Sequence, residues 1–184
     1  MNSVYFTSDT HYGHRNIIQY SRRPFSDIKE MEEAMIERWN AVVQKGDTVY
    51  HLGDFAFYQD RQSIESILSR LHGSKHLILG NHDEKCPQVG NSHWASVGHY
   101  KRIKVGEQRI ILLHYAMKVW HGSHKGAWQL HGHSHGSLPR DYTIKQLDVG
   151  VDCWAFTPIS FEKVSEEMAK HESRPVDHHG RHES

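Results

Sequence analysis

Five apolar segments of this chain each end at, or a few residues before, a side chain that can bind a metal ion. The segments are 4–6, 49–52, 77–79, 110–113 and the position of Leu130. The polar residues that follow them are Asp9 and His11, Asp54, Asn81, His114, and His133 and His135. Because residues just past the ends of buried strands can converge on one point, this pattern predicts a single polynuclear metal site.

The length and composition predict one globular domain. The chain has 184 residues and 37% hydrophobic content, enough for one packed core, which we place at residues 1–171. The remaining stretch, 172–184, is polar and rich in histidine, and we expect it to be disordered. Its histidines, with His171, are expected to collect metal only nonspecifically.

The charge balance limits the partners that we expect. Lys and Arg total 22 and Asp and Glu total 22, so no net positive field is available to hold long nucleic acid. No apolar run is long enough to cross a bilayer, and residues 1–6 do not resemble a secretory signal. We therefore expect a cytoplasmic protein without membrane contact. Cys86 and Cys153 form no C-x-x-C pair and are expected to be free thiols.

Hydrophobic periodicity predicts alternating strands and helices in the first half. Residues 31–43 and 64–71 have the spacing of amphipathic helices, and 75–79 has the composition of a strand. The order strand, helix, strand, helix, strand predicts parallel crossover units, whose ligands bind beyond the carboxyl ends of the strands.

The second half has a different rhythm. Residues 100–105 and 108–113 flank Gly106-Glu107 and predict a β-hairpin, which we expect to add antiparallel strands to the sheet. The remaining expected elements are strands at 128–131 and 147–151 and a closing helix at 161–171. The stretch 84–99, with Pro87, is predicted to be an irregular functional loop over the site.

Spacing within the polar blocks fits metal ligation. Positions two apart in an extended segment point to the same side, so Asp9 with His11, and His133 with His135, can each face one centre. Asp54 follows Gly53, which permits a sharp turn, and its two oxygens could bridge two cations.

Taken together, the polar blocks resemble the five signature motifs of the calcineurin-like metallophosphoesterases. The blocks are Asp9-Thr10-His11, Gly53-Asp54, Gly80-Asn81-His82-Asp83, His114 and Gly132-His133-Ser134-His135. The stretch 7–14, Trp39-Asn40 and the stretch 149–152 are similar to a compact, single-domain bacterial or phage branch of the family. The resemblance implies an α/β (α+β) fold in which two mixed β-sheets pack together and helices flank them.

The resemblance also implies a dinuclear metal centre. Asp9, His11 and His135 would bind one divalent ion, and Asn81, His114 and His133 the other, with Asp54 bridging the two. The ions would be manganese, iron, nickel or zinc. A hydroxide that bridges the metals would attack phosphorus. The other two implied site residues are catalytic: His82 would assist the departing oxygen, and Asp83 would orient the His82 ring.

The predicted substrate is a small phosphoester or nucleotide. A phosphodiester is favoured over a monoester because His82 offers acid assistance to a poor leaving group. Protein phosphatase activity is disfavoured because Phe55-Ala56-Phe57 follows Gly53-Asp54 in place of the Asp-Arg-Gly of those branches. Two alternatives stay open: a noncatalytic metal-binding module with the same fold, and a nuclease.

Several polar and aromatic residues allow two interpretations. His14, Arg15 and Asn16 either contact the substrate or only begin a surface helix. Asp148 and Asp152 either support the metal ligands or form a structural turn. For the other three groups the plainer interpretation is favoured: core packing for His51 and His76, packing rather than base stacking for Phe55, Phe57 and Tyr58, and a solvated face for Lys101, Arg102, Lys104 and Arg109.

Overall fold

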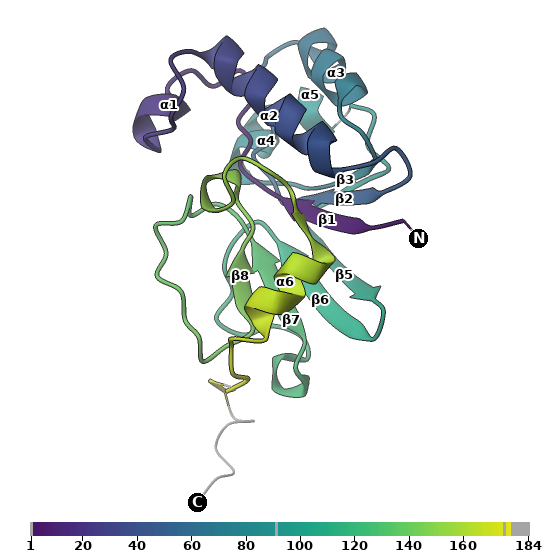
Figure 1. Cartoon of the computed structure of the whole chain (residues 1–184), viewed down its shortest axis with the longest axis vertical. Coiled ribbons are helices and arrows are strands. Elements are labelled where there is room, and N and C mark those ends of the chain that lie inside the picture. The colour runs from purple at the N-terminus through teal and green to yellow at the C-terminus, as the bar shows by residue number, and fades with distance from the viewer. Residues whose placement is uncertain (1, 91, 175, 178–184) are drawn as a thin grey trace, which may run out of the picture.

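Two mixed β-sheets lie one against the other, with helices on the outside (Figure 1). The computed structural model describes residues 2–90, 92–174 and 176–177, so the end of the predicted tail, 178–184, lies outside the described residues. Within the described part of the chain, no helix is both long and apolar enough to span a membrane.

The first sheet has the strand order β4-β3-β2-β1-β9. Strands β1 (Val4–Thr7), β2 (Thr48–His51), β3 (Ser74–Ile78) and β4 (Ser96–Gly98) run parallel. Only β9 (Ile159–Ser160), at the edge beside β1, is antiparallel. The predicted crossover topology of the first half is confirmed, and the carboxyl ends of β1, β2 and β3 meet at one edge.

Helices α2 (Ile28–Val42) and α3 (Arg61–Arg70) cover the outer face of this sheet (Figure 1). Both begin about one turn before the predicted positions because an aspartate caps each one. The Asp27 and Asp60 side chains accept hydrogen bonds from the Glu30 and Ser63 amides. There are also three shorter helices, α1 (Ile17–Tyr20), α4 (Asn81–Lys85) and α5 (Pro87–Gly90). They were not predicted from hydrophobic periodicity because none is long enough to show it.

The second sheet has the order β5-β6-β7-β8. Its strands are β5 (Tyr100–Val105), β6 (Gln108–Leu113), β7 (Trp128–His131) and β8 (Gln146–Asp148). The hairpin boundaries are as predicted, but the hairpin starts this second sheet and does not join the first, so that expectation was wrong. Strand β6 pairs with β7 in parallel, which gives the hairpin a neighbour of its own.

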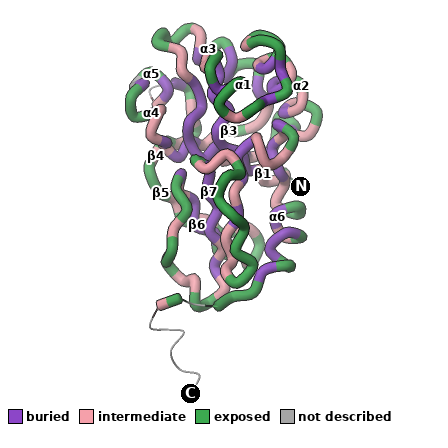
Figure 2. The backbone as a smooth tube through the Cα atoms, turned by 90° about the vertical axis from the view of Figure 1, so that its left-hand side faces the viewer, coloured by how far each residue is buried: buried purple, intermediate pink, exposed green. Residues whose placement is uncertain are grey.

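Alternate residues of the first sheet face two different cores. Phe6 and Ile78 point toward the second sheet and pack with residues such as Ile110 and Leu130, whereas Leu77 points toward the helices. Figure 2 shows the buried segments running through the centre of the molecule. Both faces of the strands are therefore apolar, and polar groups gather at the strand ends.

Helix α6 (Phe161–Met168) closes the inter-sheet core with Val164 and Met168. It ends three residues before the predicted end, and the chain beyond it still makes contacts. The Glu172 amide donates to the Tyr142 carbonyl at 2.7 Å. Two 3-10 helices, η1 (Ser123–Lys125) and η2 (Val151–Cys153), lie in connecting segments, and η2 replaces the end of the predicted strand 147–151.

The stretch 84–99 is not the irregular loop that we predicted. It contains the end of α4, helix α5 and the edge strand β4. Cys86 and Val89 are buried and Trp94 packs beside them, because the first core extends under this segment. The segment packs against the first core and supplies the edge strand of the first sheet.

Candidate metal centre

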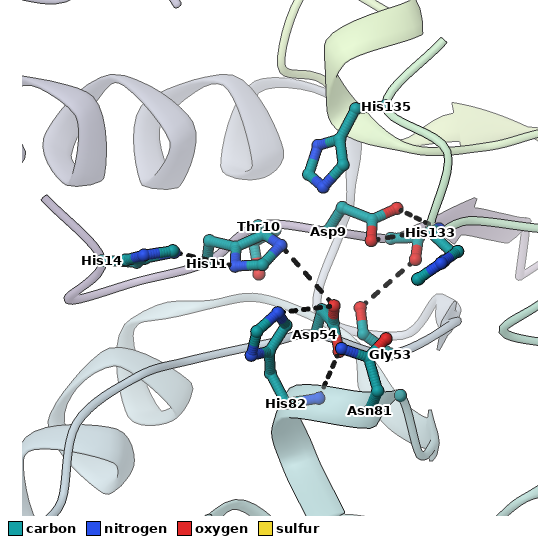
Figure 3. A network of polar contacts seen from close by, with 12 residues as sticks. Asp9, Thr10, His11, His14, Gly53, Asp54, Asn81, His82, His133 and His135 are labelled. Atoms are coloured by element: carbon teal, nitrogen blue, oxygen red, sulfur yellow. Dashed lines mark hydrogen bonds and ion pairs between the residues drawn. The ribbon is translucent and has the colours of Figure 1, made fainter. Parts of the chain in front are cut away.

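Two clusters of ligand side chains lie side by side where the strands of both sheets end (Figure 3). Within each cluster the ligand atoms are all within 4.8 Å of one another. The first cluster consists of Asp9, His11 and His135, and the second cluster of Asp54, His114 and His133. These are six of the seven ligands that the sequence predicted.

Asp54 lies between the clusters. Its Oδ2 atom is 3.7 Å from His11 Nε2 in the first cluster and 3.5 Å from His114 Nε2 in the second. The seventh predicted ligand, Asn81, joins the second cluster, since its Oδ1 atom is 3.2 Å from His114 Nε2. Asp54 is thus the residue that both clusters share.

Backbone hydrogen bonds continue from the strands into the ligand loops. The Asp9 amide donates to the Gly53 carbonyl at 2.9 Å, and the His11 amide donates to the Asp54 carbonyl at 3.0 Å. The His133 amide, from the second sheet, donates to both Asp9 carboxylate oxygens at 3.1 and 3.0 Å. The two sheets are therefore tied together through the site.

The site holds an unusual concentration of left-handed backbone. Asp9, His11, Asp54, His133 and His135 have φ angles of 59°, 54°, 56°, 67° and 47°. Residues with a Cβ adopt this region at a cost of order 1–3 kcal/mol each, and such residues cluster at functional sites. The strained backbone conformation directs these side chains toward the two clusters.

Gly53 is required next to Asp54 for the same reason. Its φ is 98°, and a Cβ there would lie 2.5 Å from His114 Nδ1 and 2.7 Å from the Gly80 backbone. Any other residue would push a ligand of the second cluster out of place.

A buried ion pair braces the first cluster. His135 Nδ1 lies 2.7 Å from Asp152 Oδ2, and Asp152 also accepts two hydrogen bonds of 2.9 Å from Arg23. Arg23, which is 4% exposed, donates further to the main-chain carbonyls of Asp9 and Thr10. Asp152 thus contacts a predicted ligand, His135, as the first of the two alternatives above requires. Arg23 was missed because nothing in the polar stretch around it indicates burial.

The second cluster is braced mainly by backbone. Asp83 is 1% exposed, and its carboxylate accepts hydrogen bonds from the amides of Gly80, Asp54 and Phe55 at 2.9, 2.7 and 2.9 Å. Both of its oxygens accept backbone hydrogen bonds, which hold the Asp54 turn, and the expectation that Asp83 orients the His82 ring stays a prediction.

In His114 and His135, the Nδ1 atom is held by a hydrogen bond, which leaves the Nε2 atom able to bind a cation. His114 Nδ1 lies 2.6 Å from the Leu52 carbonyl, which fixes the proton on that atom. His135 Nδ1 faces Asp152 in the same way. Both Nε2 atoms are then available to a cation, as is usual for metal-binding histidines.

The residues present fit a bound cation. His11 is 1% exposed, and its Nε2 atom is buried without a hydrogen-bond partner within the described chain. A buried polar atom without a partner is costly unless another group satisfies it. The set of carboxylate, amide and imidazole donors around this atom suits manganese, iron, nickel or zinc.

Without a cation the charges in the site are poorly compensated. Burial raises the pKa of Asp9 to about 7. For His114, burial acts to lower the pKa, but its contacts with Asp54 and Asp9 prevail and raise it to about 9. Burial acts to raise the pKa of Asp54, yet His114 and His11 hold it below its usual range. A divalent cation would displace the protons of Asp9 and His114.

A cleft of about 710 Å³ opens over the site. His82 and His14 both line it, and Figure 3 shows the His82 ring facing Asp54, with His82 Nε2 3.9 Å from Asp54 Oδ2. Arg15 and Asn16 are exposed and do not line the cleft, so only His14 of the three predicted substrate contacts is brought to it. Arg22, which was not predicted, does line it.

Other predictions made from single residues are largely confirmed. His51 is fully buried and contacts Thr10 Oγ1 at 3.0 Å, and His76 contacts Ser96 Oγ at 2.7 Å. The Phe57 ring stacks on His14 with a centroid distance of 3.8 Å, which favours packing over base stacking. On β5, Arg102 and Lys104 are exposed, as expected for a solvated face.

Two known proteins are similar to this chain over most of its length. An uncharacterized protein of Methanocaldococcus jannaschii, MJ1445, is 31% identical to this chain over 170 residues, which cover 89% of this chain and 90% of that protein. The Gene 66 protein of Mycobacterium phage L5 is 30% identical, covering 84% and 88% of the two chains.

A solved structure shows the same fold. The crystal structure of AQ665, a protein of unknown function from Aquifex aeolicus, has a TM-score of 0.71 and 26% identity, and the match covers 91% of this chain and all of that one. The family model of the calcineurin-like phosphoesterase superfamily domain matches residues 3–158, which include every residue of the two clusters. The chain therefore belongs to the calcineurin-like phosphoesterase superfamily.

Proposed function

We propose that this chain is a phosphodiesterase with a dinuclear metal centre that acts on small phosphodiesters or nucleotides. The observation that carries the proposal is the pair of adjacent ligand clusters that share Asp54. Family membership supports phosphoester hydrolysis, and the geometry of the clusters supports two cations rather than one.

The proposed ligands follow from the two clusters. Asp9, His11 and His135 would hold one cation, and Asn81, His114 and His133 the other. Asp54 would contact both through Oδ2, since this oxygen already faces imidazoles of both clusters. Two divalent cations held in this way neutralise phosphate charge and lower the pKa of a bound water, which makes it a nucleophile at neutral pH.

Burial and hydrogen bonding prepare the side chains of both clusters for cations. Burial of Asp9 and Asp54 keeps both carboxylates in a medium of low dielectric, where their attraction for cations is strong. His114 and His135 are fixed by hydrogen bonds on Nδ1, so little reorganisation is needed when a cation binds.

His82 is the proposed proton donor to the leaving group. Its side chain is 31% exposed at the cleft, and its own amide is anchored to Asp54 Oδ1 at 2.9 Å. Burial lowers the pKa of His82 and Asp54 opposes that effect. An anionic phosphate bound beside the ring would raise its pKa toward neutrality, where general acid catalysis is efficient.

The proposed preference for diesters rests on this acid. A diester expels an alkoxide or phenoxide that benefits from protonation, and His82 lines the cleft with its ring facing Asp54. We propose a small substrate because the cleft over the site, at about 710 Å³, has the volume of a small-molecule site.

The test is metal-dependent hydrolysis of bis(p-nitrophenyl) phosphate by protein loaded with manganese, nickel, cobalt or zinc. His82→Ala should retain both metals and lose roughly two to four orders of magnitude in rate, more with poor leaving groups than with nitrophenol. His93→Ala, at a histidine whose side chain is 83% exposed, is the matched control.

Three outcomes would contradict the proposal. No turnover with any metal would favour a noncatalytic binding module. Loss of metal from His82→Ala would make this residue a ligand rather than an acid. Faster cleavage of short DNA than of small diesters would favour a nuclease in place of a small-diester enzyme.

A further inference from the structure

The open cleft beside the first cluster is bounded on one side by α1 and the turn that follows it. Ile17, Tyr20 and Arg22 line this wall, which faces Ser134 and Ser137 from the loop after β7. No aspartate or glutamate is found among the described residues that line the cleft, although the chain has 22 acidic residues. Such a lining favours an anionic ligand.

Arg22 is the cation of this wall. Its side chain is exposed and, within the residues that the structure describes, forms no ion pair or hydrogen bond. Some exposed arginines have an acidic partner, such as Arg70 with Glu33 and Arg61 with Glu65, but Arg22 is the arginine that lines this cleft. The Arg22 guanidinium is therefore free to bind an anion with several donors.

The backbone holds Arg22 in place. Its φ is 51°, in the left-handed region, which a residue with a Cβ occupies only at a cost. The next residue, Arg23, is locked between Asp152 and the Asp9 carbonyl, and its amide donates to the Ile18 carbonyl at 2.8 Å. One arginine thus anchors the turn against the ligand loop while its neighbour lines the cleft.

We infer that Arg22 binds a second anionic group of the substrate, so that the enzyme favours phosphodiesters that carry an additional phosphate over those that carry none. This inference rests on the proposed function. The scissile phosphate is assigned to the two clusters, which leaves the Arg22 guanidinium for another anion in the same cleft. Tyr20, which is 71% exposed beside it, offers a ring face to a nucleobase.

Two dinucleotides provide matched probes. TpT and pTpT contain the same internal diester, and only pTpT has a terminal phosphate. With metal-loaded protein, kcat/KM should be about tenfold or more higher for pTpT, mainly through a lower KM, because a charge-assisted contact adds binding energy. The preference should shrink as salt rises, since the guanidinium is exposed.

Arg22→Met should reduce the ratio of kcat/KM for pTpT over TpT to near one, with both metals retained, and Arg22→Lys should restore part of it. Arg102→Met, at an exposed cation on β5 that does not line the cleft, should leave the ratio unchanged. Equal losses for both dinucleotides in Arg22→Met would overturn the inference, because Arg22 would then contact the scissile group.

The test separates this inference from the proposed function. If bis(p-nitrophenyl) phosphate is hydrolysed but pTpT and TpT are cleaved equally well, only the role of Arg22 is wrong. If bis(p-nitrophenyl) phosphate is not hydrolysed with any metal, the proposed function fails and the Arg22 inference fails with it.

Discussion

The first cluster is braced by side-chain charge from distant parts of the chain, whereas the second cluster is braced by local backbone. His135 depends on Asp152 and Arg23, which are 129 positions apart. Asp54 depends on Asp83, which gathers the amides of two neighbouring turns. The first arrangement forms only when the ends of the domain come together, and the second forms when β2 and β3 pair.

This difference explains why Asp83 was expected beside the site, whereas Asp152 of the first brace was only one of two alternatives and Arg23 was missed. Asp83 follows the ligand block directly, so its place beside the site was expected even though its contacts were not. Arg23 contacts the site only through tertiary structure, and its neighbours give no periodic signal. Burying an ion pair also costs desolvation free energy, so a charged residue such as Arg23 is not expected to be buried from the sequence alone.

The largest effect is expected where the two clusters meet. Asp54→Asn keeps the shape of the side chain but removes the charge that both cations would share, so both should bind weakly and the rate should fall by roughly three orders of magnitude or more. Metal content and diester hydrolysis measure this. Asp141→Asn, at an exposed aspartate outside both clusters, is the control. Unchanged binding of either metal would show that the clusters are separate sites.

Arg23→Met should break the brace of the first cluster. Removing one partner of a buried pair leaves a charge uncompensated and costs about 3–5 kcal/mol. Thermal unfolding should shift down by about 2–4 °C for each kcal/mol in a chain of this size. The neighbouring exposed Arg22→Met should shift it little. Similar shifts in both variants would mean that the Arg23–Asp152 pair contributes no brace.

Asp83→Asn should weaken the second cluster by a different route. An amide in place of the carboxylate leaves at least one backbone N–H group without an acceptor, which costs about 1–3 kcal/mol. Metal affinity should fall at the second cluster more than at the first. The dependence of the rate on the leaving group should not change. A changed dependence would favour the prediction that Asp83 orients the His82 ring.

The two clusters also differ in the pKa of the groups that must lose a proton when a metal binds. In the metal-free protein, the pKa of Asp9 is raised to about 7 and that of His114 to about 9. Metal must displace these protons, so affinity should rise up to tenfold per pH unit for each proton displaced. The rise that comes from His114 in the second cluster should extend to higher pH than the rise that comes from Asp9 in the first. His135 adds to the rise at the first cluster, because burial acts to lower its pKa but its hydrogen bond with Asp152 prevails and raises it.

Titration calorimetry at pH 6 and pH 8, in buffers of different ionisation enthalpy, counts the protons released. Because the pKa of folded Asp9 is raised above its ordinary value of 3.8, Asp9 should also make the metal-free protein less stable as pH rises from about 4 to 7. Metal binding should remove that loss. Affinity that does not change between pH 6 and pH 8 would contradict both assignments.

Much of the fold and the residues of the two clusters could be predicted because each depends on local pattern. Apolar runs gave most of the strands, and polar residues at their ends gave the residues of the two clusters. The partition of the strands into two sheets could not be predicted from the hairpin alone, because pairing of β6 with β7 is a long-range choice. The cleft residue Arg22 also escaped prediction, since its position depends on a left-handed turn.

The most direct test of the central claim is anomalous diffraction from crystals of the protein loaded with manganese or zinc. The account predicts two strong peaks about 3.5–4 Å apart, with the Asp54 carboxylate between them. One peak should be bound by Asp9, His11 and His135, and the other by Asn81, His114 and His133. A single peak in the site, or metal found only at histidines outside it, would contradict the account.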